Sequence, residues 1–148
     1  MNKQDITIKQ VDASLAQLQF PLRPQVGWIQ TIRTTLGMTA QQLAQRMGIS
    51  QATVSNLEKS ESAYTITLQS LQRAAQALDC EVVYALVPRQ PLSRMVSDKA
   101  TQLASASVQR VRHTMSLEAQ STPTEMAQQQ IAARKEALLS GRWSKLWS

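Results

Sequence analysis

The sequence is poor in the residues that oxidised, metal-binding and membrane proteins depend on. Its 148 residues include one cysteine, Cys80, so no disulfide can form within the chain, and a reducing cytoplasm is the expected location. The single histidine, His113, has no cysteine or carboxylate at ligand spacing, so we expect no metal site. No segment approaches the length of a membrane span, and the first residues lack the apolar core of a signal peptide.

Signatures of catalysis are missing as well. The chain has only four glycines, and none of them lies in a loop that cradles phosphates or in a nucleophile elbow. Its ten acidic residues are too scattered to suggest a carboxylate pair. We therefore expect neither an enzyme nor a bound cofactor.

What the sequence does contain favours a basic, helical protein. Apolar residues make up 43% of the chain and aromatic residues only 4%, and alanine, glutamine and leucine are common, as is typical of helices. The net charge is +6, and the surplus is uneven. Up to Gln90, eight Lys/Arg face six Asp/Glu, which gives +2; after it, eight face four, which gives +4. A basic surplus suits a phosphate-rich partner.

The first 79 residues are predicted to form an arm followed by a compact helical domain. Residues 1–25 form the arm, with a polar start, a short helix over Gln10–Gln19 and a stiff link at two prolines. Residues 26–79 form the domain. Apolar spacing and capping residues predict its four helices from Trp28 to a stop at Gly37, over Ala40–Met47, over Gln51–Lys59, and from Thr67 to Leu78.

Residues 80–88 have a different character. Cys80–Val87 is rich in β-branched residues and is followed by Pro88, which predicts one strand. A lone strand leaves its backbone groups unsatisfied, and no other segment of the chain is a good strand. Pairing with the same strand of a second chain resolves this, so we expect a homodimer formed through Val82, Val83, Tyr84, Ala85 and Leu86.

Residues 89–148 are predicted to be a helical region that binds a partner. Apolar residues indicate one long helix from Leu92 to about Ala119 and a second helix that ends at Gly141. The tail carries Trp143 and Trp147, which are docked either on the protein's own core or on a partner.

The segment Gly37–Glu61 carries the pattern from which we infer function. It places two short helices around a tight turn at Gly48–Ser50. In DNA-binding proteins one such helix crosses the phosphate backbone, and the next presents its first residues to the major groove. Glutamine and asparagine pair with adenine there, while alanine and threonine methyls contact the thymine methyl. The candidate DNA-binding residues are Thr39, Gln41, Ser50, Gln51, Ala52, Thr53, Ser55, Asn56 and Lys59.

These residues resemble the lambda-repressor-like (Cro/XRE) helix-turn-helix family. The resemblance implies an ion pair of architectural importance between Arg33 in the first helix and Glu58 at the end of the third. The chain departs from the family at Ala40, where a phosphate-contacting glutamine is common, and at Lys59-Ser60, where glycine often follows the glutamate. The matching positions are Gly37, Thr39, Leu43, Ala44, Gly48, Ile49, Ser50, Val54, Leu57 and Glu58.

A wider resemblance, to the group called mobile mystery protein A, covers most of the chain. Members of this group are encoded beside a Fic-domain protein, so the resemblance implies an antitoxin-like repressor paired with a Fic-type enzyme. It is carried by Trp28-Ile29, Ile32-Arg33, Thr65–Leu68, Ala77–Pro88, His113–Met115 and Leu146-Trp147.

Four residues of the C-terminal region are candidates for contact with that partner: Thr114, Glu118, Trp143 and Trp147. Fic enzymes can be restrained by a helix that carries Ser/Thr-x-x-x-Glu, and Thr114 and Glu118 have that spacing, as do Ser121 and Glu125. An ordinary helix surface explains the same residues, because this spacing arises easily by chance.

The sequence thus predicts a mainly α fold: a lambda-repressor-like helix-turn-helix bundle, one short strand that pairs across a dimer, and C-terminal helices. The predicted function is a transcriptional repressor that binds an inverted-repeat operator, regulates its own synthesis and acts as antitoxin-like partner of a Fic-type toxin. The alternative is a protein-interaction inhibitor of a Fic-type enzyme, which works through residues 89–148 and does not use its helix-turn-helix for DNA.

Overall fold

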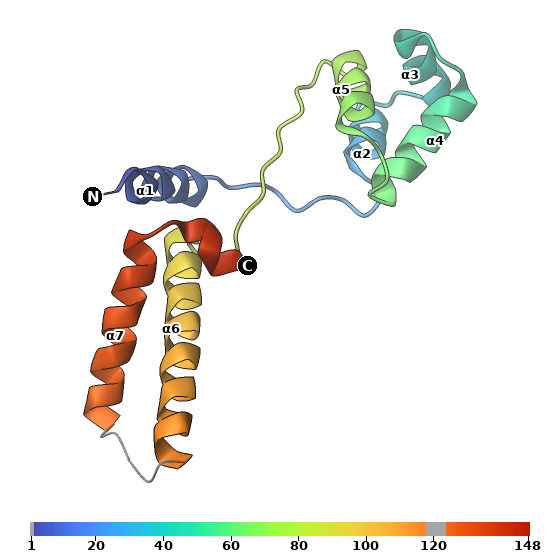
Figure 1. Ribbon diagram of the computed structural model, residues 1–148. Coiled ribbons are helices and arrows are strands. Elements are labelled where there is room, and N and C mark those ends of the chain that lie inside the picture. The colour runs from blue at the N-terminus through green and yellow to red at the C-terminus, as the bar shows by residue number, and fades with distance from the viewer. Residues whose placement is uncertain (1, 118–123) are drawn as a thin grey trace. The chain divides into compact units, whose positions relative to one another are not determined.

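The computed structural model describes residues 2–117 and 124–148, and all regular secondary structure in these residues is helical (Figure 1). The mainly α fold class is confirmed. The chain divides into two compact units. We call Gln19–Leu86 the inserted unit, because it interrupts a discontinuous unit built from Met1–Leu18 and Val87–Ser148.

The inserted unit contains four helices whose ends follow from their capping residues. They are α2 (Trp28–Thr35), α3 (Ala40–Met47), α4 (Gln51–Ser62) and α5 (Leu68–Ala77). The hydroxyls of Thr39, Ser50 and Thr67 each accept a hydrogen bond of 3.1 Å from the backbone N–H three residues later. These bonds satisfy donors that have no partner inside the helix. Helix α3 has the predicted bounds, and α4 continues beyond the predicted end at Lys59.

The core of the inserted unit is formed by one face of each helix. Leu43 and Val54 are completely buried, and burial of a side chain of this size stabilises the fold by about 1.5–3 kcal/mol. Leu36, expected on the same face as Ile29 and Ile32, is instead 61% exposed, because α2 has already ended at Thr35. The buried set is Ile29, Leu43, Ala44, Val54, Ala74 and Leu78.

The discontinuous unit is built from α1 (Lys3–Ala16), α6 (Leu92–Leu117), α7 (Thr124–Ser140) and the short 3₁₀-helix η1 (Trp143–Trp147). The buried face of α6 repeats every fourth residue, as one stripe of an α-helix does. Two of its four residues are alanines, whereas the larger side chains of Met95 and Val111 on the same helix are exposed. The buried stripe consists of Val96, Ala100, Ala104 and Val108.

Helix α1 belongs with α6 and starts earlier than predicted. It begins at Lys3 rather than Gln10, since the Asn2 N–H donates to the Asp5 carboxylate at 3.1 Å and closes the first turn. Its Ile8 packs against the cluster formed by Val96, Ala100 and Leu146. The expected short helix of the arm is therefore longer, and it packs against a segment far along the sequence.

Asp12 joins the two segments of this unit. Its carboxylate accepts hydrogen bonds from the backbone N–H of Leu92 at 2.6 Å and of Ser93 at 3.0 Å, at the start of α6. Bonds from Ser93 and then from Leu92 favour the charged form, so the pKa of the Asp12 carboxyl lies below its usual range.

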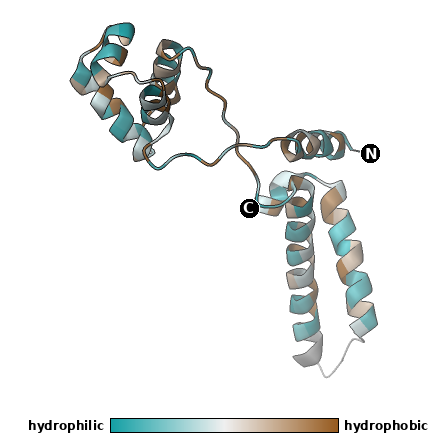
Figure 2. Cartoon of the chain, turned by 180° about the vertical axis from the view of Figure 1, so that it is seen from behind, coloured by the Kyte–Doolittle hydropathy of each residue, from teal (hydrophilic) through white to brown (hydrophobic). Residues whose placement is uncertain are grey.

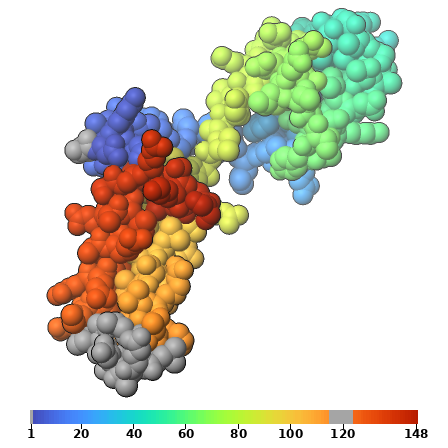
Figure 3. Space-filling view, viewed as in Figure 1, coloured from blue at the N-terminus to red at the C-terminus, as the bar shows by residue number. Residues whose placement is uncertain are grey.

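The strand predicted to pair across a dimer at Cys80–Val87 is not seen in the single chain. The segment carries no regular secondary structure, because a strand is defined by ladder bonds to a neighbour and no described segment of this chain supplies them. Its apolar side chains are uncovered: Val83, Tyr84 and Leu86 are 69%, 66% and 83% exposed. Figure 2 shows the extended segment after α5 as largely hydrophobic, and Figure 3 shows it at the surface.

Candidate nucleic-acid interface

Helices α3 and α4 form a helix-turn-helix around Gly48. Gly48 adopts the left-handed conformation (φ 68°) that ends α3, and the Ile49 N–H donates to the Ala44 carbonyl at 3.0 Å to complete the turn. Ser50 then caps α4 directly, so a single residue, Ile49, lies between the C-cap of α3 and the N-cap of α4. This geometry leaves the first turn of α4 exposed.

The face of α4 that points away from the core carries the predicted DNA-binding side chains. Val54, Glu58 and Glu61 are buried on the opposite face. Every predicted DNA-binding residue is exposed except Ser55, which is half-buried, and the exposed set is Thr39, Gln41, Ser50, Gln51, Ala52, Thr53, Asn56 and Lys59.

The exposed side chains differ in how free they are to bind a ligand. The hydroxyls of Thr39, Ser50 and Thr53 already take part in capping, with a bond of 2.7 Å between the last two. The side chains of Gln41, Gln51, Asn56 and Lys59 make no hydrogen bond to the part of the chain that the structure describes. Of these, Gln51 and Asn56 are the two amides on α4, and both are able to pair with an external hydrogen-bonding surface.

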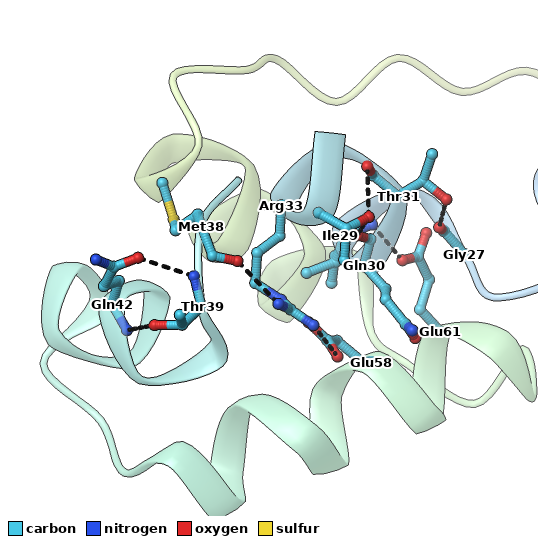
Figure 4. Close-up of polar contacts among 11 residues, drawn as sticks. Gly27, Ile29, Gln30, Thr31, Arg33, Met38, Thr39, Gln42, Glu58 and Glu61 are labelled. Carbon is cyan, nitrogen blue, oxygen red and sulfur yellow. Dashed lines mark hydrogen bonds and ion pairs between the residues drawn. The ribbon is translucent and has the colours of Figure 1, made fainter. Parts of the chain in front are cut away.

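The ion pair between Arg33 and Glu58 is present and braces the site (Figure 4). Arg33 Nε and Nη2 donate to the two carboxylate oxygens of Glu58 at 2.6 and 3.2 Å, and Nη1 donates to the Met38 carbonyl at 2.9 Å. The two side chains are only 13% and 10% exposed. One guanidinium thus joins α2, α4 and the loop before α3, as the resemblance implied.

A second brace, centred on Glu61, was not predicted. Its two carboxylate oxygens accept the backbone N–H groups of Trp28 and Ile29, both at 2.8 Å, so α4 caps the N-terminus of α2 (Figure 4). Gly27 makes this possible: it has φ 87°, and a Cβ there would lie 2.6 Å from Glu61 Oε1. The sequence signal was the glycine directly before the first apolar residues of a helix.

The inserted unit carries little net charge for a DNA-binding surface. Between Gln19 and Leu86 five Lys/Arg stand against four Asp/Glu, which gives +1. Three of the five, Arg23, Arg33 and Arg46, are already bound to groups of the protein. Non-specific attraction to phosphates is therefore weak here, and binding depends on the fit of α4 to its target.

Among the predicted partner-binding residues that the structure describes, Thr114 lies on α6 and the two tryptophans lie in the tail. Thr114 is exposed on α6 and donates to the Arg110 carbonyl at 3.1 Å, while Glu118 and Ser121 lie outside the described residues. Trp143 is half-buried and donates to the Leu139 carbonyl at 2.8 Å, so it docks on its own unit. Trp147 is 55% exposed. The tail packs near Ala100, 14 residues before Thr114 and hence about 21 Å along the helix.

Two other kinds of site were sought in the described residues. No group of three or more His, Cys, Asp or Glu side chains is placed to hold a metal ion. No described helix is long and apolar enough to cross a membrane.

Comparison with known proteins identifies the inserted unit. Residues 29–84 match a family described as Helix-turn-helix. No curated protein and no solved structure matches the chain. The matched range begins inside α2 and covers α3, α4 and α5. The chain therefore carries a helix-turn-helix domain, the kind of domain with which transcription regulators bind DNA.

Proposed function

We propose that this protein is a sequence-specific transcriptional repressor that reads DNA with α4. The observation that carries the proposal is the unengaged polar face at the start of α4, held on a frame of two buried carboxylate braces. Rigid support of this kind is what base readout requires, because hydrogen bonds to base edges need side chains placed to within about 0.5 Å.

The arrangement suits the major groove. Helix α3 crosses the backbone, and α4 enters the groove with its first turns. Gln51 and Asn56 pair with adenine edges, and Ala52 and Thr53 contact thymine methyl groups. Thr39, Gln41, Ser50 and Lys59 lie toward the phosphates, where capped helix starts and one lysine favour anions.

The operator is proposed to be an inverted repeat bound by two copies of the chain. The support is the stretch Val83–Val87, whose side chains are exposed in a single chain, while Cys80 and Val82 are half-buried. Antiparallel pairing of two such segments would satisfy backbone groups and cover side chains in both copies at once, through Val82, Val83, Tyr84, Ala85 and Leu86. A two-fold dimer also offers two recognition helices to a palindrome, about 34 Å apart.

A protein partner is proposed for the discontinuous unit. The resemblance to mobile mystery protein A implies a Fic-type toxin, with this chain as its antitoxin-like partner and the regulator of their synthesis. Exposed Trp147 beside fully buried Leu146 offers an aromatic anchor of the kind that dominates protein interfaces. Co-purification with the Fic-domain protein tests this: Trp147→Ala should release it, whereas Trp143→Phe, in the docked position, should retain it.

A salt-dependent shift assay on the DNA upstream of the encoding gene tests the repressor function. Operator binding should exceed binding to random DNA by about 10³-fold or more at physiological salt. Equal affinity for the two DNAs, together with retained partner binding, would instead favour the inhibitor that works through residues 89–148.

A further inference from the structure

The connector between α1 and α2, residues 17–27, is fixed to the C-terminal end of α4 by Arg23. Its Nη1 donates to the Glu61 carbonyl at 3.1 Å, and its Nη2 donates to the Ser62 carbonyl at 3.4 Å. The guanidinium lies 3.8 Å from the centre of the Tyr64 ring, a cation–π contact. Ser62 Oγ also donates to the Gln25 carbonyl at 2.9 Å, so the connector meets the helix end at two points.

These bonds complete the end of the helix. The last four carbonyls of an α-helix have no partner within it. In α4 three of them have a local donor: the Lys59 carbonyl accepts from the Ala63 N–H at 2.9 Å, the Ser60 carbonyl from the Thr65 N–H at 2.8 Å, and the Glu61 carbonyl from the Tyr64 N–H at 3.1 Å. Arg23 adds a second donor to the Glu61 carbonyl, and among the described residues it is the donor that reaches the Ser62 carbonyl. A cation at this position also suits the negative end of the helix dipole.

The same helix end is linked to α2. Glu61 accepts from Arg23 with its carbonyl and caps α2 with its carboxylate. The C-terminal half of α4 is therefore held from two directions. Its exposed face carries Lys59, and the exposed Asn56 lies directly before this half. Loss of the guanidinium would free one of these two anchors while the buried core face of α4 remained in place.

We propose that Arg23 is a positioning residue for DNA recognition. It fixes the C-terminal half of α4 so that Lys59 and the adjacent Asn56 meet the DNA in register, and it does not itself contact DNA. The inference rests on the proposed repressor function and assigns a role to a residue outside the helix-turn-helix.

The test compares operator affinity at several salt concentrations for the wild type, Arg23→Ala and Arg23→Lys, each well below its melting temperature. Arg89→Ala is the matched control. Arg89 is an exposed arginine in the segment between α5 and α6, and it makes no hydrogen bond to the described residues. We expect Arg23→Ala to weaken operator binding about tenfold, equivalent to about 1.4 kcal/mol. The slope of log K against log salt should equal that of the wild type. Lysine should restore part of the loss, and Arg89→Ala should bind like the wild type.

Two results would overturn the proposal. If the slope of log K against log salt were smaller in magnitude by about 0.9 in Arg23→Ala than in the wild type, Arg23 would bind a phosphate directly. Unchanged operator affinity in the folded Arg23→Ala protein would show a role in stability alone. Failure of the repressor function is separately visible, because the wild type itself would then prefer no DNA sequence.

Discussion

At the scale of single residues, the side chains able to read bases are those that the fold leaves unengaged. Gln51 lies at the first position of α4 with a free amide. Gln51→Ala should cost about 1–3 kcal/mol of operator affinity and relax specificity at one base pair in each half-site. Gln72→Ala, an exposed glutamine of α5, is the control and should bind normally. Unaltered affinity and sequence preference in Gln51→Ala would remove α4 from the role of recognition helix.

Removal of one partner of a buried ion pair destabilises a protein more than removal of both partners does. Glu58→Ala leaves the Arg33 guanidinium uncompensated and should lower the free energy of unfolding by about 3–5 kcal/mol. The double change Arg33→Met with Glu58→Leu should cost far less, because it removes both charges. Denaturant unfolding measures all three proteins. Asp98→Ala breaks an exposed pair of 4.0 Å and should change stability by less than about 1 kcal/mol; a similar small effect of Glu58→Ala would argue against the pair's importance.

The close approach at Gly27 can be separated from its backbone conformation. Gly27 and Gly37 both have positive φ, 87° and 69°, but only Gly27 has a neighbour within reach of an added Cβ. Gly37→Ala should cost about 1–2 kcal/mol through its conformation alone. Gly27→Ala should cost more, because the Cβ also displaces the Glu61 carboxylate from the start of α2. Equal melting temperatures of the two variants would contradict this reading of the Glu61 brace.

At the scale of elements, the sequence predicted best where local signals decide the structure. Capping residues and apolar spacing placed α3 and the start of α4. Prediction failed where a partner lies far along the chain. Glu61 sits in a polar segment that looks solvated, and only the fold shows that it caps α2. The strand predicted at Cys80–Val87 is not seen in the single chain, since residue preference alone cannot form a ladder.

The association of α1 with α6 provides a prediction about acidity. Because hydrogen bonds from the start of α6 lower the pKa of Asp12, its stabilising contribution is present above the ordinary aspartate pKa and is lost as pH falls through the lowered value. Asp12→Asn should weaken the contact at neutral pH and remove this part of the acid dependence. The rate of amide hydrogen exchange at Leu92 and Ser93, recorded as a function of pH, measures the strength of this contact. Asp98→Asn, on the exposed surface of α6, should keep the wild-type acid dependence; the same behaviour in Asp12→Asn would exclude the cap.

At the scale of the whole molecule, the proposed dimer depends on a segment, Cys80–Val87, that has no regular secondary structure in the single chain. Tyr84→Pro removes a ladder donor and fixes φ, so it should yield a monomer that no longer binds the operator while the helix-turn-helix stays folded. Tyr84→Thr keeps the donor and introduces a β-branched side chain, which suits a strand, so it should remain a dimer. Sedimentation at micromolar concentration measures both. A monomeric wild type, or a dimeric proline variant, would rule out this interface.

The insertion of one unit into the other also orders events during synthesis. Helix α1 leaves the ribosome first, yet Leu92, the residue that Asp12 binds, follows 80 positions later. The whole inserted unit is translated in between, and domains made earlier generally fold earlier. Once folded, that unit replaces most of a long flexible loop, and closing the remainder costs less chain entropy. A newborn chain thus carries a finished helix-turn-helix while α1 still waits for its partner helix.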